Sequence, residues 1–247
     1  MITHKKVVAT HFHKTLIIDI ETVPLQYDWN MMPDALQDHW LRKLNLLRLT
    51  DEERHDPEQQ FRDRAGIYAE FGKIVCIGLG YVYEQDGASK VRLKSIANDD
   101  EKLLLEEFLQ TLRVFGEQHR DITLAGHNIK EFDIPYICRR LTINGLELPA
   151  CMDLAGLKPW QVHHQDTLEL WRFGDYKNYT SLDLLAYVLG VPSSKSDIDG
   201  SKVSQVYWEE KNLDRIAQYC LRDVYTTALV YLRLKGWTES LPEACYV

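Results

Sequence analysis

A short apolar run near the amino terminus carries two acidic residues and constrains the fold more than any other segment. Residues 15–22 read TLIIDIET, and their β-branched and apolar side chains predict a buried strand. Side chains alternate between the two faces of a strand, so Asp19 and Glu21 project from the same face. Two neighbouring carboxylates resist joint ionisation unless a cation or a strong donor lies between them. The spacing therefore indicates a metal site.

A third acidic residue follows a second short strand. Residues 122–125 predict a buried strand, and residues 126–137 continue from it into a helix that contains Asp133. Ligand sites commonly lie at the ends of strands in α/β sheets. Asp133 followed by Pro135 is also an ordinary helix beginning, in which the carboxylate caps free backbone N–H groups. Both interpretations of Asp133 stay open from the residues alone.

The fourth acidic residue lies in a predicted helix near the carboxyl terminus. Residues 213–225 have helical character, and Tyr219 and Asp223 are four positions apart, so both side chains reach the same face. A single Tyr–Asp pair at this spacing is common on exposed helices. Its occurrence after the three other acidic positions, in this order, favours one shared site.

The order of the remaining segments predicts the fold class. Strands over 74–83 and 90–96 flank Asp86-Gly87, a strong hairpin signal, so the first three strands are expected to be antiparallel. A helix is predicted to start from a cap at Asn98 or Asp99 and to end near Gly116. Strands in a meander followed by alternating strands and helices indicate an α/β protein. We expect a ribonuclease H-like mixed sheet, antiparallel first and then parallel, flanked by helices.

The polar segment after the first strand is too long for a turn. We interpret residues 23–70 as a partly helical insertion, because Pro33 suits a helix start and residues 35–41 have helical apolar spacing. The insertion either covers the site as a lid or is a surface excursion without substrate contact. The length and composition favour a single domain over residues 1–247.

Charge and composition narrow the class of protein. The formal net charge of −8 argues against a protein that coats nucleic acid by bulk electrostatics, but bound divalent ions would neutralise part of it. No run of 18 apolar residues occurs, and the amino terminus lacks the apolar core of a secretion signal, so we expect a cytoplasmic protein without a membrane partner. Five cysteines without a CxxC pair indicate reduced thiols. The adjacent His163 and His164 are expected on the surface.

Three motifs resemble the DEDD exonuclease superfamily, in particular the proofreading domains of B-family DNA polymerases. Residues 19–22 are similar to the first exonuclease motif, residues 126–136 to the second and residues 219–223 to the third. The histidine branch of the superfamily would place a His five residues before the last Asp. Gln218 stands there, so the tyrosine branch is indicated. At 247 residues, the chain is similar to stand-alone predicted 3′-5′ exonucleases.

The resemblance implies a catalytic site of five residues. Asp19, Glu21 and Asp223 would bind one metal ion, Asp19 would bridge to a second, and Asp133 would hold that second ion. An all-oxygen site suits two Mg²⁺ or Mn²⁺ ions. Tyr219 would orient the attacking water, because a phenol is a poor base at neutral pH.

The resemblance also suggests residues that hold the substrate, namely Thr22, Asn128, Phe132, Ser181 and Leu182. Phe132 and Leu182 have core packing as an alternative, and Ser181 has helix capping. Single-stranded 3′ ends are the expected partner, with DNA favoured over RNA. A 3′-5′ exoribonuclease, a non-catalytic nucleic-acid-binding module of the same fold, and an association with a DNA polymerase or repair protein stay open.

Overall fold

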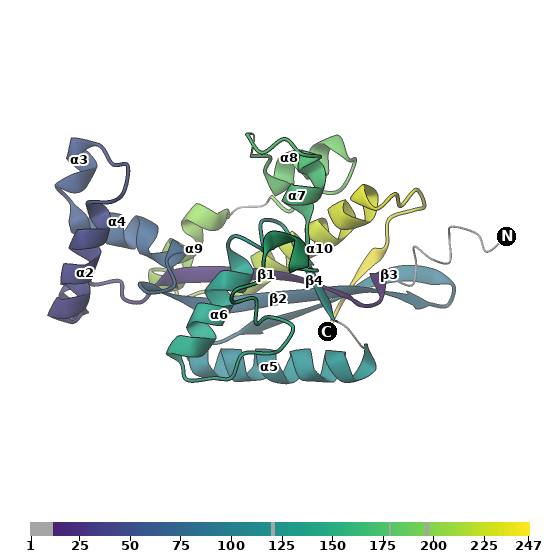
Figure 1. Ribbon diagram of the computed structural model, residues 1–247, viewed down its shortest axis with the longest axis horizontal. Helices are drawn as coiled ribbons and strands as arrows, with labels where there is room; N and C mark the ends of the chain where they lie inside the picture. Colours follow the sequence, from purple (N-terminus) through teal and green to yellow (C-terminus); the bar gives the residue numbers. More distant parts are fainter. Residues whose placement is uncertain (1–11, 120–121, 178, 196–197) are drawn as a thin grey trace.

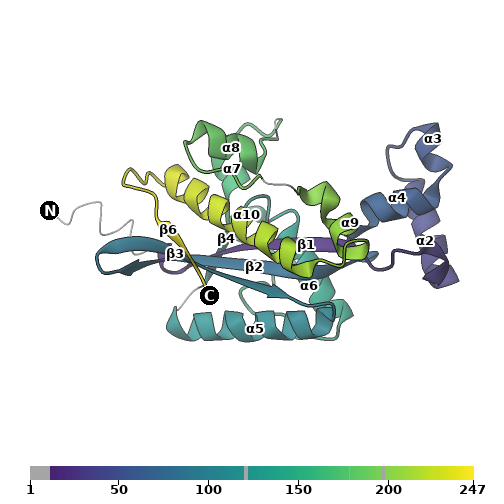
Figure 2. The same cartoon turned by 180° about the vertical axis from the view of Figure 1, so that it is seen from behind.

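A mixed sheet of six strands lies between two layers of helices in the computed structural model, which describes residues 12–119, 122–177, 179–195 and 198–247. Figures 1 and 2 show α5 along one face of the sheet and α10 along the other. The described strands and longer helices are β1 (Thr15–Pro24), α2 (Asp34–Leu44), α3 (Asp51–Arg54), α4 (Pro57–Arg64), β2 (Gly72–Gln85), β3 (Ala88–Ala97), α5 (Glu101–Gln118), β4 (Thr123–Gly126), α6 (Asp133–Ile143), β5 (Gln165–Asp166), α7 (Thr167–Arg172), α8 (Leu182–Val188), α9 (Val203–Trp208), α10 (Leu213–Leu234) and β6 (Glu243–Tyr246).

The strand order and directions confirm the predicted ribonuclease H-like mixed sheet. The order is β5-β4-β1-β2-β3-β6. β1, β2 and β3 pair antiparallel, whereas β4 is parallel to β1, β5 to β4 and β6 to β3. The predicted hairpin between β2 and β3 is also present. Asp86 and Gly87 both have positive φ, at 52° and 76°, as a tight two-residue turn of this kind requires.

The two faces of β1 pack against different helices. Leu16, Ile18 and Ile20 belong to a buried cluster with residues of α5 and α6. Ile17 packs in a second cluster with α8 and α10. Because side chains alternate along a strand, Asp19 and Glu21 lie on the face that α10 covers. The strand therefore contributes one apolar face to the core and one acidic face to the space beneath α10.

Helix α5 begins and ends later than the sequence predicts. Its cap is Asp100, whose carboxylate accepts hydrogen bonds from the backbone N–H groups of Lys102 and Leu103 at 2.9 and 3.2 Å. The helix continues through Gly116 to Gln118. A β-carbon at Gly116 would lie 3.1 Å from the Ile122 side chain, so this glycine allows close packing and does not end the helix.

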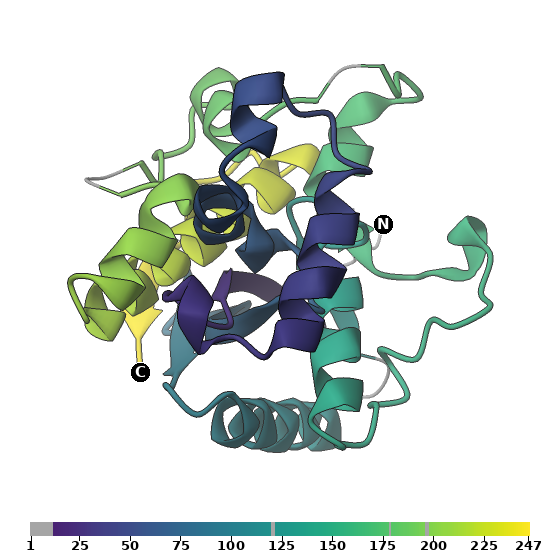
Figure 3. The same cartoon turned by 90° about the vertical axis from the view of Figure 1, so that its left-hand side faces the viewer.

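The insertion is partly helical, as predicted, and has a hydrophobic cluster of its own. α2 begins directly after Pro33, and α3 and α4 follow. Trp40 lies at the centre of this cluster, with the rings of Phe61 and Phe71 each 5.2 Å from its own. The purple and blue helices of Figure 3 lie at one end of the sheet. The assignment of residues 1–247 to a single domain stays a prediction.

None of the helices within the described ranges combines the length and apolar composition that crossing a bilayer requires. All five cysteines are free, and Cys76 and Cys220 are buried.

Candidate active site

The acidic face of β1 meets α10 because β2 carries glycine at the contact. Gly78 pairs with Asp19 in the β1–β2 ladder. A β-carbon at Gly78 would lie 2.7 Å from both the Cys220 sulfur and a methyl group of Val224. The missing side chain lets α10 approach the sheet, and the Cys220 sulfur comes within 3.5 Å of the Asp19 carboxylate. The glycine thus controls how closely the third motif approaches the first.

Tyr219 and Asp223 lie one turn apart on α10 and are linked to each other. The side chains of Tyr219 and Ser194 both interact with the Asp223 carboxylate and oppose the rise of its pKa on burial. Ser194 is only 6% exposed. The sequence analysis did not identify Ser194, because it lies in a loop and no spacing rule connects it to α10. The predicted approach of Tyr219 and Asp223 to one point is present.

Asp133 is tied to β1 rather than used as a helix cap. It is the first residue of α6, and the preceding residue, Phe132, makes no side-chain capping bond. One Asp133 carboxylate oxygen accepts a hydrogen bond from the backbone N–H of Ile20 at 3.0 Å. Ile20 lies beyond Ile17, the last residue of β1 that pairs with β4. Asp133 therefore takes the place of a strand partner between Asp19 and Glu21.

A second buried carboxylate holds the loop that leads to Asp133. Asp166 is 3% exposed and accepts hydrogen bonds from the backbone N–H groups of Asn128, Lys130 and Leu168. Asn128 has a φ of 63°, a left-handed conformation that asparagine tolerates better than most residues. The sequence analysis did not identify Asp166, whose role depends on a contact across the sheet edge.

One pocket of about 410 Å³ contains all five predicted catalytic residues. Of the predicted substrate-holding residues, Thr22, Asn128 and Phe132 also line it. The other described lining residues are Ile20, Pro24, Arg62, Asp63, Gly66, Ile67, His127, Tyr179, Gly200, Ser201 and Ser204. The three elements that carry the catalytic residues, β1, α6 and α10, thus converge with the insertion on a single cavity.

Ser181 and Leu182 lie elsewhere. The Ser181 hydroxyl caps α8 by accepting a hydrogen bond from the backbone N–H of Leu184 at 3.3 Å. Leu182 packs against the hydrophobic cluster under α8 and α10. Neither residue is among the described residues that line the pocket. The structure therefore places both in the alternative roles that their sequence context offered, a helix cap and a packing residue.

Burial and mutual repulsion act on the carboxylates in the same direction. Burial, followed by the charges of Asp133 and Asp223, raises the pKa of Asp19 well above its usual value. Burial and the charge of Asp19 do the same to the pKa of Glu21. Burial raises the pKa of Asp133 to about 7 and also raises the pKa of Asp223. Without added positive charge, the four groups resist carrying four negative charges.

The donor set fits hard divalent cations. Ligand atoms of Asp19, Glu21 and Cys220 lie within 4.8 Å of one another. Carboxylate oxygens are the preferred ligands of Mg²⁺ and Mn²⁺. Burial raises the pKa of the Cys220 thiol, which therefore stays protonated and serves as a hydrogen-bond donor to Asp19. Asp133 and Asp223 face the same cavity and supply further oxygens.

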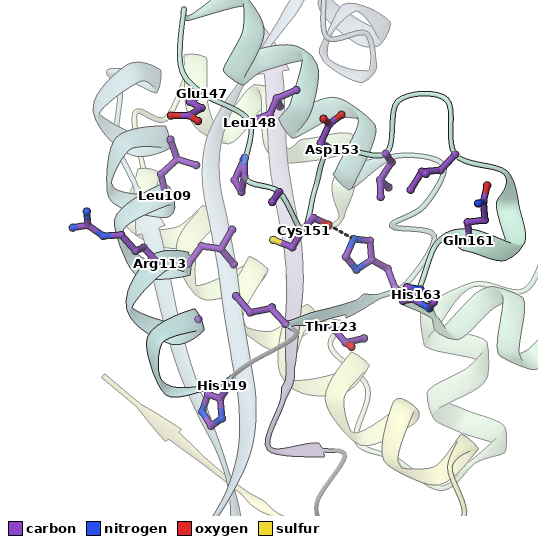
Figure 4. Close-up of a pocket in the computed structure, with 18 residues that line it drawn as sticks. Leu109, Arg113, His119, Thr123, Glu147, Leu148, Cys151, Asp153, Gln161 and His163 are labelled. Carbon is purple, nitrogen blue, oxygen red and sulfur yellow. Dashed lines mark hydrogen bonds between the residues drawn. The ribbon is translucent and has the colours of Figure 1, made fainter.

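A larger groove of about 1190 Å³ lies between α5 and residues 147–164 (Figure 4). It shares none of its described lining residues with the carboxylate pocket. Its wall includes His164, which was expected on the surface but is 4% exposed. His164 accepts a hydrogen bond from the backbone N–H of Leu124 and donates one to the Cys151 carbonyl. The histidine joins β4 to the neighbouring loop, a contact that its position in the sequence does not reveal.

A family described as predicted 3′-5′ exonuclease related to the exonuclease domain of PolB matches residues 67–247. The matched region contains Asp133, Tyr219 and Asp223, whereas Asp19 and Glu21 precede it. No curated protein sequence matches the chain.

Proposed function

Because the chain belongs to the family of predicted 3′-5′ exonucleases related to the exonuclease domain of PolB, we propose that it shortens single-stranded DNA from the 3′ end, releasing nucleoside 5′-monophosphates. The observation that carries the proposal is the convergence of four carboxylates and Tyr219, from β1, α6 and α10, on one pocket. The buried carboxylates favour bound cations, and a pocket of this kind suits hydrolysis at phosphorus.

The acidic residues would hold two divalent ions. Asp19, Glu21 and Asp223 would bind one ion. Asp133 would bind a second ion, and Asp19 would contact both. When bound, two such ions lower the pKa of a water and stabilise the leaving 3′-oxygen of an in-line displacement. Mg²⁺ and Mn²⁺ are the proposed ions, because hard cations prefer oxygen ligands.

Tyr219 would orient the attacking water. Burial, followed by the charge of Asp223, raises the pKa of Tyr219 above its usual value, so the hydroxyl keeps its proton at neutral pH. It therefore acts as a hydrogen-bonding group and not as a base. The neighbouring Asp223 carboxylate, with which this hydroxyl interacts, would help to orient it.

The pocket wall would grip the strand without reading its sequence. The Phe132 ring can stack on any base, and Thr22 and Asn128 can hydrogen-bond sugar or phosphate oxygens. A polar pocket of about 410 Å³ is suited to one terminal nucleotide rather than a duplex. DNA is the proposed substrate on the likeness to polymerase proofreading domains.

A 5′-labelled single strand with Mg²⁺ or Mn²⁺ tests the proposal. We expect a ladder that shortens one nucleotide at a time from the 3′ end and that disappears in Asp19→Ala. The matched control is Asp214→Asn, which removes an exposed acidic residue from the first turn of α10. An internal cut, or immediate release of the 5′ label, contradicts an exonuclease of this polarity.

The same assay with RNA of equal sequence separates the remaining alternatives. Faster shortening of RNA would replace the DNA exonuclease proposal by a 3′-5′ exoribonuclease. Binding of both strands without shortening of either would indicate a non-catalytic module of the same fold.

A further inference from the structure

The pocket that holds the catalytic carboxylates has one permanent positive charge among its described lining residues, and that charge comes from the insertion. The lining includes five carboxylates, those of Asp19, Glu21, Asp63, Asp133 and Asp223. Arg62 of α4 is the only arginine or lysine among the same described residues. Arg62 precedes residue 67, where the family match begins, so the family match does not assign this residue a role.

The guanidinium of Arg62 is held in place, but not all of its hydrogen-bond donors have a partner among the described residues. Its Nε donates a hydrogen bond to the Tyr27 carbonyl at 3.2 Å, and its central carbon lies 5.1 Å from the Tyr27 ring centre. One terminal nitrogen pairs with Glu58 on the same helix. The other terminal nitrogen has no hydrogen-bond partner among the described residues. Arg62 is 31% exposed at the pocket, so a ligand can reach it.

Contacts between the insertion and α9 set the position of Arg62. The Tyr27 hydroxyl donates a hydrogen bond to Glu209 at 2.5 Å, and the Tyr27 ring lies 6.3 Å from that of Trp208. Figures 1 and 2 both show α4 and α9 at the same end of the sheet. Arg62 is therefore held at the wall of the pocket through Tyr27, which itself contacts the end of α9.

The charges that line the pocket indicate which part of the substrate Arg62 binds. Two divalent ions would offset the four catalytic carboxylates and contact the scissile phosphate, which leaves Arg62 as the one arginine or lysine among the described lining residues for a neighbouring phosphate. We propose that Arg62 binds a backbone phosphate of the single strand whose 3′ end occupies the pocket. This inference rests on the proposed function and extends it, because it assigns the insertion a direct substrate contact.

The pairing with Glu58 does not prevent this role. Glu58 and Arg62 are an i,i+4 pair with side chains 37% and 31% exposed, and such exposed pairs contribute little. A phosphate offers two oxygens to the planar fork of an arginine and so makes a stronger, bidentate contact. Arg62 exchanges a weak partner on its own helix for the substrate.

Equilibrium binding of a 5′-fluorescein-labelled oligothymidylate in Ca²⁺ tests the contact, with strand integrity checked after each titration. Arg62→Gln is expected to raise Kd about tenfold, the typical effect of losing a hydrogen bond to a charged group. It should also make the slope of log K against log salt shallower by about 0.7, the contribution of one phosphate contact on a single strand. The matched control, Arg64→Gln, removes the same charge two residues along α4, where Arg64 pairs with Glu53 and Gln60.

Two further variants separate substrate contact from a role in holding the insertion together. Glu58→Gln removes the competing carboxylate, so we expect binding about twofold tighter, within the small effect of an exposed ion pair. If Arg62 served only to anchor the insertion, Glu58→Gln would leave binding unchanged or weaken it. Arg62→Lys keeps the charge and is expected to keep the salt slope while losing part of the affinity. These two variants decide the question if Arg62→Gln fails to fold.

The binding and hydrolysis results can fail separately. Equal affinity and salt slope in Arg62→Gln and Arg64→Gln would overturn the Arg62 contact, and a 3′-to-5′ ladder from the wild type would leave the proposed function standing. A specific loss of binding in Arg62→Gln, together with no ladder from the wild type, would support the contact and reject the exonuclease. Absence of wild-type strand binding would overturn the contact.

Discussion

Buried carboxylates lie in two regions of this molecule with opposite surroundings. Glu101, at the start of α5, is 7% exposed and pairs with Arg140, which is 5% exposed. Its oxygens also accept hydrogen bonds from the Ile74 N–H and the Asn144 side chain. In the pocket under α10, the four catalytic carboxylates share one cavity, and none of the salt bridges among the described residues includes any of them. A buried carboxylate that is paired with an arginine stabilises the fold, whereas buried carboxylates without such a partner favour bound metal ions.

Removing the arginine of the Glu101–Arg140 pair should destabilise the protein strongly. Arg140→Met leaves Glu101 buried and unpaired, and we expect the free energy of unfolding to fall by about 3–5 kcal/mol. Urea denaturation measures the change. The double variant Arg140→Met with Glu101→Gln should recover most of the loss, because no buried charge is left unpaired. If Arg140→Met were as stable as the wild type, Glu101 would not need its arginine partner, and the two regions would not differ in this respect.

The corresponding change in the pocket should affect activity and spare stability. Asp19→Asn is expected to slow strand hydrolysis about 10²- to 10³-fold, as the loss of one major electrostatic contact does. Its free energy of unfolding in chelator should be unchanged or higher, since the substitution removes repulsion with Asp133 and Asp223. Urea denaturation and initial rates measure both, with Asp214→Asn as the control. Destabilisation as large as that of Arg140→Met would contradict this assignment.

The stability of the metal-free protein is expected to depend on pH through the pocket carboxylates. Burial raises the pKa of Asp133 to about 7, above its value in the unfolded chain, so the folded state binds the proton more tightly between about pH 4 and 7. The unfolded state then binds fewer protons in this window, and stability falls as pH rises through it. We expect a decline of about 2 kcal/mol between pH 5 and 7 from this group.

Denaturation series in chelator at several pH values measure that decline. Asp133→Asn, which keeps an acceptor for the Ile20 N–H, should flatten it. Saturating Mg²⁺ should flatten it as well, because bound cations favour the ionised carboxylates. A wild-type protein that gains stability from pH 5 to 7 in chelator, relative to Asp133→Asn, would show that the pocket acids are already compensated.

The smallest effect is expected at Tyr219. Tyr219→Phe removes one hydrogen bond that orients water and should lower kcat about tenfold, with Mg²⁺ affinity unchanged by calorimetry. Tyr225→Phe is the matched control on α10, since the Tyr225 hydroxyl bonds to the Pro242 carbonyl outside the pocket. A loss of metal binding in Tyr219→Phe would move this residue from water positioning to the support of Asp223.

Local periodicity was sufficient for the parts of the site that lie on a single element. Asp19 and Glu21 share a strand face because side chains alternate along a strand, and Tyr219 and Asp223 share a helix face because they are four positions apart. The mixed character of the sheet, antiparallel first and then parallel, followed from the hairpin signal and the later alternation of strands and helices. The two side-chain inferences depend on residues no more than four positions apart.

Contacts between distant segments were outside the reach of such rules. Ser181 was predicted to hold substrate, but it caps α8, because a serine hydroxyl next to free helix N–H groups has a partner close at hand. Asp133 had capping as its simplest interpretation, yet it bonds to Ile20, 113 residues away. Ser194 and Asp166 support the site through bonds that no spacing in the sequence indicates.

The order and local spacing of residues along the chain supplied the chemical groups, four carboxylates and a tyrosine that suit a two-metal site. The packing of the elements settled which buried carboxylates have an arginine partner, as Glu101 has, and it brought Arg62 of the insertion to the pocket of the catalytic carboxylates. The physical reason is that side-chain alternation acts within one element. Burial and charge compensation depend on which elements pack together, and here Gly78 and the end of β4 determine that packing.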